Sequence, residues 1–206
     1  MDVDKKPPCS IREVKPGSSV YVMDDIISDE LCDTLKIVMD KTKRSSREEY
    51  TKNNNVLCER IPIISIENEK FAKILDDKIY QCISDAGRQL ISICKDIHHI
   101  GSDDGYTLRK IRGATRLHSD SVFSDAIENL PKDSPIRRDV RKLSLIIALN
   151  SDYEGGEFYF PKQGIDKIKL KKGQAILFPP YWTHPHGVNI PENNTFRYTI
   201  NTWLNE

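Results

Sequence analysis

The chain lacks a long apolar segment. Its longest apolar run lies within LSLIIAL and is far shorter than the roughly 20 residues that a membrane-spanning helix needs. The first residues, MDVDKKPPCSIR, also lack the apolar centre of a secretion signal. These absences predict a protein that neither spans a membrane nor is exported, and we expect a cytoplasmic location.

An excess of one charge is missing as well. Lys plus Arg and Asp plus Glu each number 31, so the formal net charge is zero. Without a net positive field the chain has no general attraction for nucleic acid or for an anionic membrane. We therefore expect neither of them as a partner.

Cysteine is scarce, and its spacing fits no common metal site. The five cysteines lie in the first half of the chain and form no C-x-x-C pair: Cys9, Cys32, Cys58, Cys82 and Cys94. The odd number argues against a disulfide framework, and the spacing argues against a zinc cluster. A reducing intracellular setting is the simpler interpretation.

The first half of the chain predicts helices. After a short strand, Ser28 stands where a helix cap is expected, and apolar residues then recur on one face as far as about residue 43. A longer helix is predicted over about 67–97 from the same spacing. The polar stretch 43–55 is predicted to be an exposed loop, and residues 1–15 a flexible lead.

Beyond about residue 105 the pattern changes to short runs rich in β-branched and aromatic residues, separated by Gly, Pro and Asn. Helices followed by many short strands predict an α+β fold in which helices brace an antiparallel sandwich or jelly roll. We expect a single domain, 1–206, with its β core in about 105–206. The expected strands are YTLRKI, LSLIIALN, EFYF, KIKL, QAILF and FRYTINTWL.

The stretch TRLHSD places His118 two residues before Asp120. Side chains alternate along a strand, so both would face the same side and could hold one cation. Such a pair also arises by chance at this composition, so it needs support. Two further histidines, His184 and His186, provide it, because two His and one carboxylate on a β scaffold form the facial triad of non-haem Fe(II) oxygenases. Surface or packed histidines are the alternative.

An arginine lies within the strand-forming segment FRYTINTWL. Arg197 has no carboxylate in that strand to pair with, and a buried unpaired charge is costly. A bound anionic cofactor would supply the partner, because the planar guanidinium suits a carboxylate and Thr199 faces the same side with a hydroxyl. A surface arginine that pairs with another strand is the alternative.

These residues resemble the 2-oxoglutarate/Fe(II)-dependent dioxygenases, in particular the prolyl 4-hydroxylase-like branch. The resemblance implies a double-stranded β-helix (jelly roll) core braced by N-terminal helices. It implies His118, Asp120 and His186 as iron ligands, with His186 preferred to His184 because HGV matches the family pattern. Arg197 would bind the far carboxylate of 2-oxoglutarate, with Thr199 as a possible helper. Five blocks follow the family's order: DDIISDELCDTL, LRKIRGATRLHSD, KLSLIIALNSDYEGGEFYF, LKKGQAILFP and HGVNIPENNTFRYTINTW.

The resemblance also implies an activity. It points to an Fe(II)- and 2-oxoglutarate-dependent hydroxylase that forms succinate and CO2, uses ascorbate as a reductant and acts on proline within a peptide or protein. Tyr181 and Trp182 offer aromatic faces for such a peptide, and the loop 121–141 would close over it. A hydroxylase of a free amino acid or other small molecule, or a non-catalytic cupin-like metal-binding module, remains the alternative.

The sequence departs from the family in its details. His186 and Arg197 are slightly further apart than usual, which predicts a larger turn at IPENN. Ala148 stands where several relatives have a tyrosine that touches the oxoglutarate carboxylate, and Lys110 or Thr115 could replace that contact. Trp203 could line the oxoglutarate pocket or belong to the core.

Overall fold

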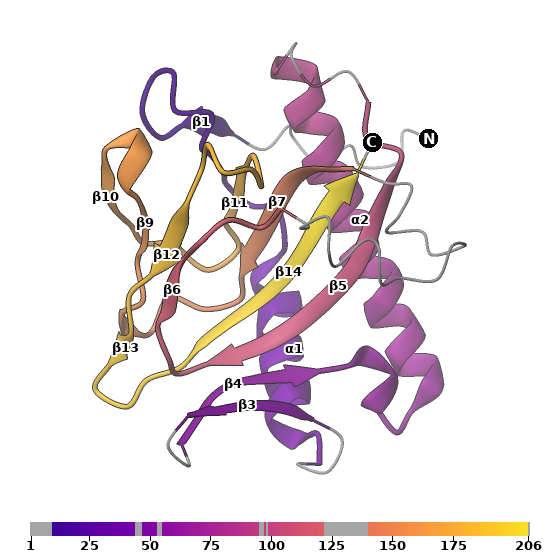
Figure 1. Ribbon diagram of the computed structural model, residues 1–206. Coiled ribbons are helices and arrows are strands. Elements are labelled where there is room, and N and C mark those ends of the chain that lie inside the picture. The colour runs from indigo at the N-terminus through magenta and orange to yellow at the C-terminus, as the bar shows by residue number, and fades with distance from the viewer. Residues whose placement is uncertain are drawn as a thin grey trace, which may run out of the picture.

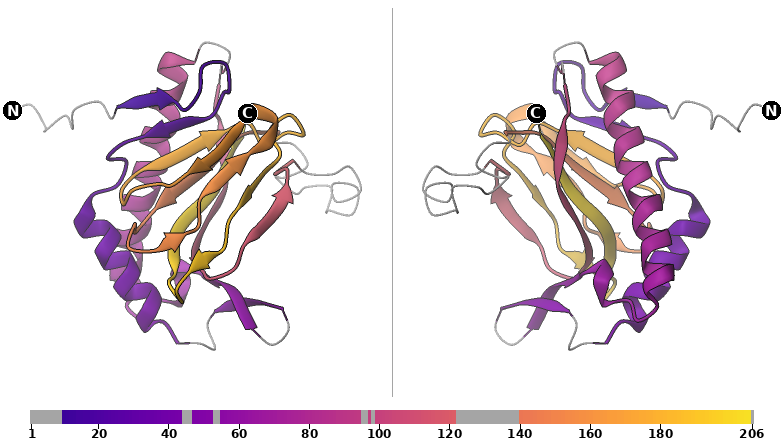
Figure 2. Two further views of the ribbon diagram at one scale, coloured as in Figure 1. Left: turned by 90° about the vertical axis from the view of Figure 1, so that its left-hand side faces the viewer. Right: turned by 90° about the vertical axis from the view of Figure 1, so that its right-hand side faces the viewer.

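The computed structural model describes residues 10–43, 47–52, 55–94, 97, 99–121 and 140–205. Two antiparallel sheets face each other, and two helices cover the outer face of the larger sheet (Figures 1 and 2). This arrangement confirms the predicted α+β class with a jelly-roll core. Within the described ranges, no helix is both long and apolar enough to cross a membrane.

The two helices form where the apolar spacing predicts them. Helix α1, Asp29–Lys41, is capped by Ser28, whose Oγ accepts a hydrogen bond from the Leu31 N–H at 3.2 Å. Helix α2, Glu69–Ile93, is capped in the same way by Asn68. Both helices lie on the same side of the larger sheet, as Figure 2 shows. Their apolar faces therefore share one core with that sheet.

The larger sheet has eight strands, and the smaller sheet four. In spatial order the larger contains β1 (Ile11–Glu13), β2 (Tyr21–Met23), β11 (Ala175–Phe178), β7 (Arg141–Ala148), β14 (Arg197–Asn205), β5 (Ser102–Ile111), β4 (Asn55–Ile61) and β3 (Glu48–Lys52). The smaller contains β10 (Ile165–Ile168), β9 (Phe158–Phe160), β12 (His186–Val188) and β6 (Thr115–His118). A separate pair joins β13 (Pro191–Glu192) to β8 (Glu154–Gly155), and short 3-10 helices lie at η2 (Ile63–Ser65) and η4 (Pro161–Gln163).

Strand β7 shows how the larger sheet buries both faces. Leu145 and Ile147 point outward into the core beneath the helices, while Ile146 and Ala148 point inward into the core between the sheets. Fully burying a Leu or Ile side chain contributes roughly 1.5–3 kcal/mol. Because both faces are covered, β7 is apolar almost throughout and fixes the position of its neighbour β14.

The prediction of an exposed loop over 43–55 is wrong for residues 48–52, which are exposed but form a strand, while residues 44–46 and 53–54 lie outside the described residues. Residues Glu48–Lys52 form β3, which pairs with β4, and β4 continues the sheet from β5 with Ile61 opposite Leu108. Every side chain of β3 is exposed, so its sequence has no alternating apolar pattern, and backbone pairing alone makes it a strand.

Two other boundaries also differ from expectation. The flexible lead predicted for residues 1–15 contains β1, which pairs with β2, while residues 1–9 lie outside the described part of the chain. The strand expected at KIKL begins two residues earlier, as β10.

Candidate metal and anion site

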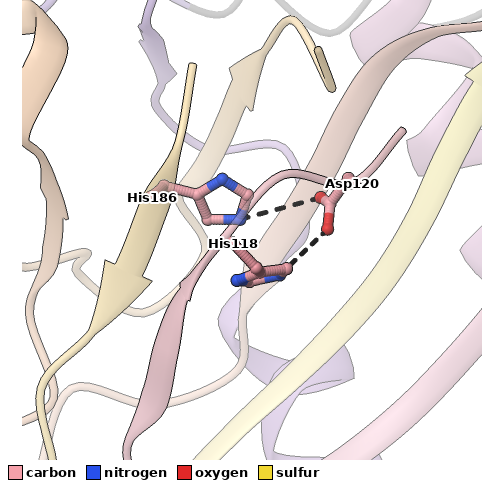
Figure 3. Close-up of side chains that lie close together, drawn as sticks. All are labelled: His118, Asp120 and His186. Atoms are coloured by element: carbon pink, nitrogen blue, oxygen red, sulfur yellow. Dashed lines mark ion pairs between the residues drawn. The ribbon is translucent and has the colours of Figure 1, made fainter. Parts of the chain in front are cut away.

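Three side chains that sequence analysis singled out lie together. His118 ends β6 and His186 begins β12, and these two residues are directly opposite each other in the pairing of the two strands. Asp120 lies just beyond β6, with its Oδ1 3.1 Å from His118 Nε2 and its Oδ2 3.7 Å from His186 Nε2 (Figure 3). One ligand atom from each residue lies within 4.8 Å of the others, so the three could hold one metal ion.

Backbone carbonyls orient both imidazoles. His118 Nδ1 lies 2.9 Å from the Arg116 carbonyl oxygen, and His186 Nδ1 lies 3.2 Å from the His184 carbonyl oxygen. A carbonyl only accepts a hydrogen bond, so each Nδ1 carries the proton. Nε2 is therefore the atom of each ring that is left to bind a metal, and both Nε2 atoms face Asp120; at His118 the metal would replace the proton that Nε2 donates to Asp120.

Strand β7 of the opposite sheet holds Asp120 in place. Ser144 Oγ donates to Asp120 Oδ2 at 2.6 Å, and Arg141 Nη1 donates to the Asp120 carbonyl oxygen at 2.7 Å. Burial alone would raise the pKa of Asp120, but the hydrogen bonds from His118 and Ser144 help to outweigh it and hold that pKa well below its usual range. Asp120 is thus anionic at neutral pH.

The two histidines differ in their surroundings. His186 is only 4% exposed, and the rings of Phe160 and Phe178 pack against it with centroids 5.5 and 4.5 Å away. Burial lowers the pKa of His186, whereas the hydrogen bond with Asp120 raises the pKa of His118. Burial therefore keeps His186 in the neutral form that binds metals.

His184 faces away from this cluster. Its Nε2 lies 2.9 Å from the Ser18 carbonyl oxygen, and its Nδ1 lies 2.9 Å from Thr183 Oγ1. Both ring nitrogens are thus occupied by protein groups, and His184 ties the chain before β12 to the segment before β2. The family resemblance favoured His186 over His184, and of these two it is His186 whose ligand atom lies within 4.8 Å of those of His118 and Asp120.

Arg197 is buried without a carboxylate partner in the described part of the chain. It is 4% exposed, its Nη1 makes one long hydrogen bond to the Gly156 carbonyl oxygen at 3.4 Å, and its Nε has no partner. Burial lowers the pKa of Arg197 to about 10, so the group stays cationic at neutral pH. Thr199 lies opposite Ala148, and its hydroxyl donates to Asn201 Oδ1 at 2.6 Å.

Tyr153 also belongs to this group of residues, and sequence analysis missed it. A Cβ added at Gly156 would lie 2.9 Å from Tyr153 Cε2 and 3.7 Å from Arg197 Cδ. The tyrosine ring and the aliphatic part of the Arg197 side chain therefore both pack beside Gly156. Gly156 has φ +67°, which brings the chain back toward β14. The signal that could have found Tyr153 is this glycine turn, since Tyr153 follows the family's tyrosine position, Ala148, by only five residues.

The two replacements suggested for that missing tyrosine fare differently. Lys110 lies on the opposite face of β5, where its Nζ donates to Asp40 Oδ1 at 2.7 Å, so it does not face Arg197. Thr115 begins β6 opposite Val188, and no contact with Arg197 is found for it. A turn lies at IPENN, where Asn193 and Asn194 both adopt positive φ, of 51° and 60°.

Other expected features lie at the edge of the site or outside it. Most of the loop 121–141, predicted to close over substrate, lies outside the described residues. Trp203 lies under the Arg141 guanidinium, whose Cζ is 4.0 Å from the ring centroid. A cavity of about 320 Å³ opens between α2 and the start of β5, lined by residues that include Tyr80, Arg88 and Asp103, but it contains no residue of the metal cluster.

Comparison with known proteins places these observations in context. Residues 108–205 match the model of the 2OG-Fe(II) oxygenase superfamily. No curated protein matches the chain at the level of sequence.

Several solved structures share the fold. The viral collagen prolyl hydroxylase of Paramecium Bursaria Chlorella virus-1, in its 2OG complex, is 20% identical, with a TM-score of 0.59 over 94% of this chain and 98% of that one. A Trichoplax adhaerens prolyl hydroxylase, solved with a hypoxia inducible factor peptide, is 14% identical, with a TM-score of 0.63 over 92% and 84%. A Pseudomonas putida prolyl-4-hydroxylase is 12% identical, with a TM-score of 0.58 over 92% and 94%. At these identities the likeness shows a shared fold.

Proposed function

We propose that the chain is an Fe(II)- and 2-oxoglutarate-dependent hydroxylase of proline within a peptide, because residues 108–205 match the model of the 2OG-Fe(II) oxygenase superfamily. The observation that carries this proposal is the cluster of His118, Asp120 and His186 in one corner of the jelly roll, with all three ligand atoms turned toward one another. Two imidazoles and one carboxylate are the donor set that suits Fe(II) and leaves positions for other ligands.

The surrounding residues fit the two groups that the family implies. The lone pairs at His118 Nε2 and His186 Nε2 and the anionic Asp120 would hold the iron. The buried and unpaired Arg197 would bind the far carboxylate of 2-oxoglutarate. When bound, the iron would supply the oxidation: O2 would give one oxygen atom to the keto acid, which becomes succinate and CO2, and the other to the substrate as a hydroxyl.

The remaining site residues would position these groups. Ser144 and Arg141 fix the orientation of Asp120, and Phe160 and Phe178 exclude water from one side of His186. Thr199 and Tyr153 flank Arg197 and would present hydroxyl groups to the same carboxylate, Thr199 by turning its hydroxyl away from Asn201. Tyr153 would thereby supply the contact that Ala148 cannot make.

A peptide substrate is supported by the structural neighbours, since those named above are prolyl hydroxylases and one of them is solved with a peptide. Trp182 adds to this, because the residue is 73% exposed and stands four residues before His186. An exposed aromatic face suits the ring of a proline in an extended segment.

The test measures both products. The protein is incubated with Fe(II), 2-oxoglutarate and ascorbate against Pro-rich peptides, collagen-like repeats and free amino acids, and added oxygen is located by fragmentation. We expect succinate to form and one oxygen to be added to proline in a peptide. Omitting ascorbate tests its role as the reductant.

The His186→Ala variant is the negative control in this assay, and His184→Ala is the matched positive control. Oxygen added only to free amino acids would refute the peptide substrate. No succinate with any substrate would refute the hydroxylase itself and favour a non-catalytic metal-binding module.

A further inference from the structure

Arg109, in the middle of β5, is a second cation in the site that no described carboxylate neutralises. Its Nε is fully buried without a hydrogen-bond partner, and it forms no ion pair with a described residue. Arg109 and Arg197 are the only arginines in the described chain with an unpartnered buried nitrogen. A buried guanidinium in this state is costly unless a bound anion pairs with it.

The strand pairing shows which way Arg109 faces. Thr199 is directly opposite Arg109 on β5 and directly opposite Ala148 on β7, and residues opposite each other in a sheet share a face. Ala148 belongs to the core between the two sheets. Arg109 therefore points into the space between the sheets, where the metal cluster lies.

Arg109 and Arg197 have different surroundings. Arg109 Cζ lies 6.0 Å from the Trp203 ring centroid, and the Asp120 carboxylate contributes to the electrostatic environment of Arg109. The Arg197 guanidinium instead lies over Phe158, with Cζ 4.9 Å from that ring centroid. The two arginines thus address different parts of the site, and the far carboxylate of 2-oxoglutarate at Arg197 would leave Arg109 without an anion.

A second arginine, Arg60, lies between Arg109 and the solvent. Arg60, on β4, is directly opposite Arg109, and its side chain is 54% exposed. Its nearest carboxylate in the described chain is the exposed Glu48, 4.0 Å away, which neutralises it only weakly. Arg109 and Arg60 therefore form a line of positive charge from the interior of the site to its rim, on a protein without net charge.

We propose that Arg109 and Arg60 form a carboxylate-binding subsite, through which the protein selects a peptide that carries an acidic side chain beside the residue it hydroxylates. The hydroxylation in this statement rests on the proposed function, whereas the binding does not. A guanidinium pairs with a carboxylate in a planar two-point contact, which gives direction as well as affinity. Arg109 would bind the acidic side chain of the peptide, and Arg60 would attract that side chain toward the site by its charge.

The test uses dye-labelled, proline-centred peptides in matched pairs that differ only in Glu or Gln, on one side of the proline or the other. Binding is followed by fluorescence anisotropy, with Mn(II) and 2-oxoglutarate present and again with the protein alone. We expect the Glu peptide of one pair to bind about tenfold to a hundredfold more tightly than its Gln twin. Arg109→Met should abolish this preference, Arg60→Gln should reduce it, and Arg109→Lys should restore part of it.

The matched control is Lys110→Met. It removes the same charge from the next residue of β5, but on the face where Lys110 pairs with Asp40. We expect this variant to keep the full preference for the Glu peptide. A thermal unfolding midpoint for each variant separates loss of binding from loss of fold.

Two results would overturn the proposal. One is equal binding of the Glu and Gln peptides by the wild-type protein. The other is an Arg109→Met variant that keeps the peptide preference but loses affinity for 2-oxoglutarate, measured by Trp203 fluorescence in a Trp182→Phe background, which would assign Arg109 to the keto acid. If the protein prefers the Glu peptides but never adds oxygen to them, the proposed hydroxylation is refuted and the proposed subsite is supported.

Discussion

Tyr198 and Arg197 lie on opposite faces of β14 and are both buried, but their polar groups are satisfied differently. On the outer face, Tyr198 is 6% exposed and its hydroxyl donates to Asp40 of α1 at 2.8 Å. On the inner face, Arg197 is 4% exposed and its Nε has no partner. Burial alone therefore does not distinguish a structural group from a binding group. The difference lies in whether the protein itself completes the hydrogen bonds.

Strand β5 shows the same contrast in two consecutive residues. Lys110 faces outward and pairs with Asp40, while Arg109 faces inward and is unpaired in the described chain. On the outer face, folding alone pairs the charged group. On the inner face, the charged group gains a partner only when a ligand binds. Substitutions on the outer face should consequently lower stability and leave binding unchanged. Substitutions on the inner face should weaken binding and leave stability unchanged.

The largest expected effect separates the two buried histidines that lie closest in sequence. His186→Ala should reduce metal retention to background, because it removes one of three ligands and leaves the ion held at two points. His184→Ala should keep the metal and lose roughly 1–3 kcal/mol of stability, because the Ser18 carbonyl loses its partner. Metal content after desalting and chemical denaturation measure the two effects. Metal loss in His184→Ala alone would reverse the assignment.

Arg197→Met tests the inner face directly. The affinity for 2-oxoglutarate should fall by roughly thirtyfold to several thousandfold, since removing one partner of a buried charge pair costs about 2–5 kcal/mol. The stability of the ligand-free protein should not fall, because an apolar side chain replaces an unpaired charge. Titration calorimetry and urea unfolding of the same variant supply both values. A variant that unfolds more easily but binds normally would make Arg197 an ordinary structural residue.

A smaller effect is expected at Ser144, whose hydroxyl donates to Asp120 Oδ2. Ser144→Ala should weaken metal affinity by about tenfold to a hundredfold, the range for groups that orient a metal ligand. Competition with a chelator of known affinity measures the change. The outer-face substitution Leu145→Ala, one residue along β7, is the control: it should lower stability by roughly 2–5 kcal/mol and leave metal affinity unchanged in the folded fraction.

The smallest expected effect is a pH dependence of the unfolding free energy, which arises in the core between the helices and the larger sheet. Burial raises the pKa of the Cys32 thiol from 9.0 to about 12. The folded protein favours the protonated thiol. Its contribution to stability is therefore complete below the pKa of the thiol in the unfolded chain, and it is lost as the pH rises from that pKa toward the pKa in the folded protein. Unfolding free energies between about pH 8 and pH 10 should therefore decline, and Cys32→Ala should flatten the decline. An unchanged slope in that variant would assign the decline to other groups.

Sequence periodicity predicted the elements that bury apolar side chains. Helices α1 and α2 and strands β7, β11 and β14 repeat apolar residues at a spacing set by the backbone, so their existence could be deduced locally. His118, Asp120 and His186 could be proposed from motifs, because a strand places alternate residues on one face. That the two histidines are directly opposite each other depends on the pairing of β6 with β12, which no local pattern contains.

The missed features depend on contacts between distant segments. Arg109 looks like any basic residue in a strand, and its lack of a partner is visible only when β4, β5 and β14 lie together. Tyr153 comes close to Arg197 through a glycine turn whose path the sequence does not fix. Strands β3 and β4 have too few buried residues to produce a period, so their pairing with β5 decides their structure.

The polar composition of β3 has a further consequence for the whole molecule. A strand at the end of a sheet carries unpaired backbone groups and can recruit a strand from another chain, which is a common start of aggregation. In the described chain, β3 and β1 are the two ends of the larger sheet, and they carry Glu48, Glu49, Lys52, Arg12 and Glu13. Charges of both signs at these ends oppose the stacking of one molecule onto the next. The residues that hide β3 from a search for apolar periodicity thus protect the protein's solubility at high concentration.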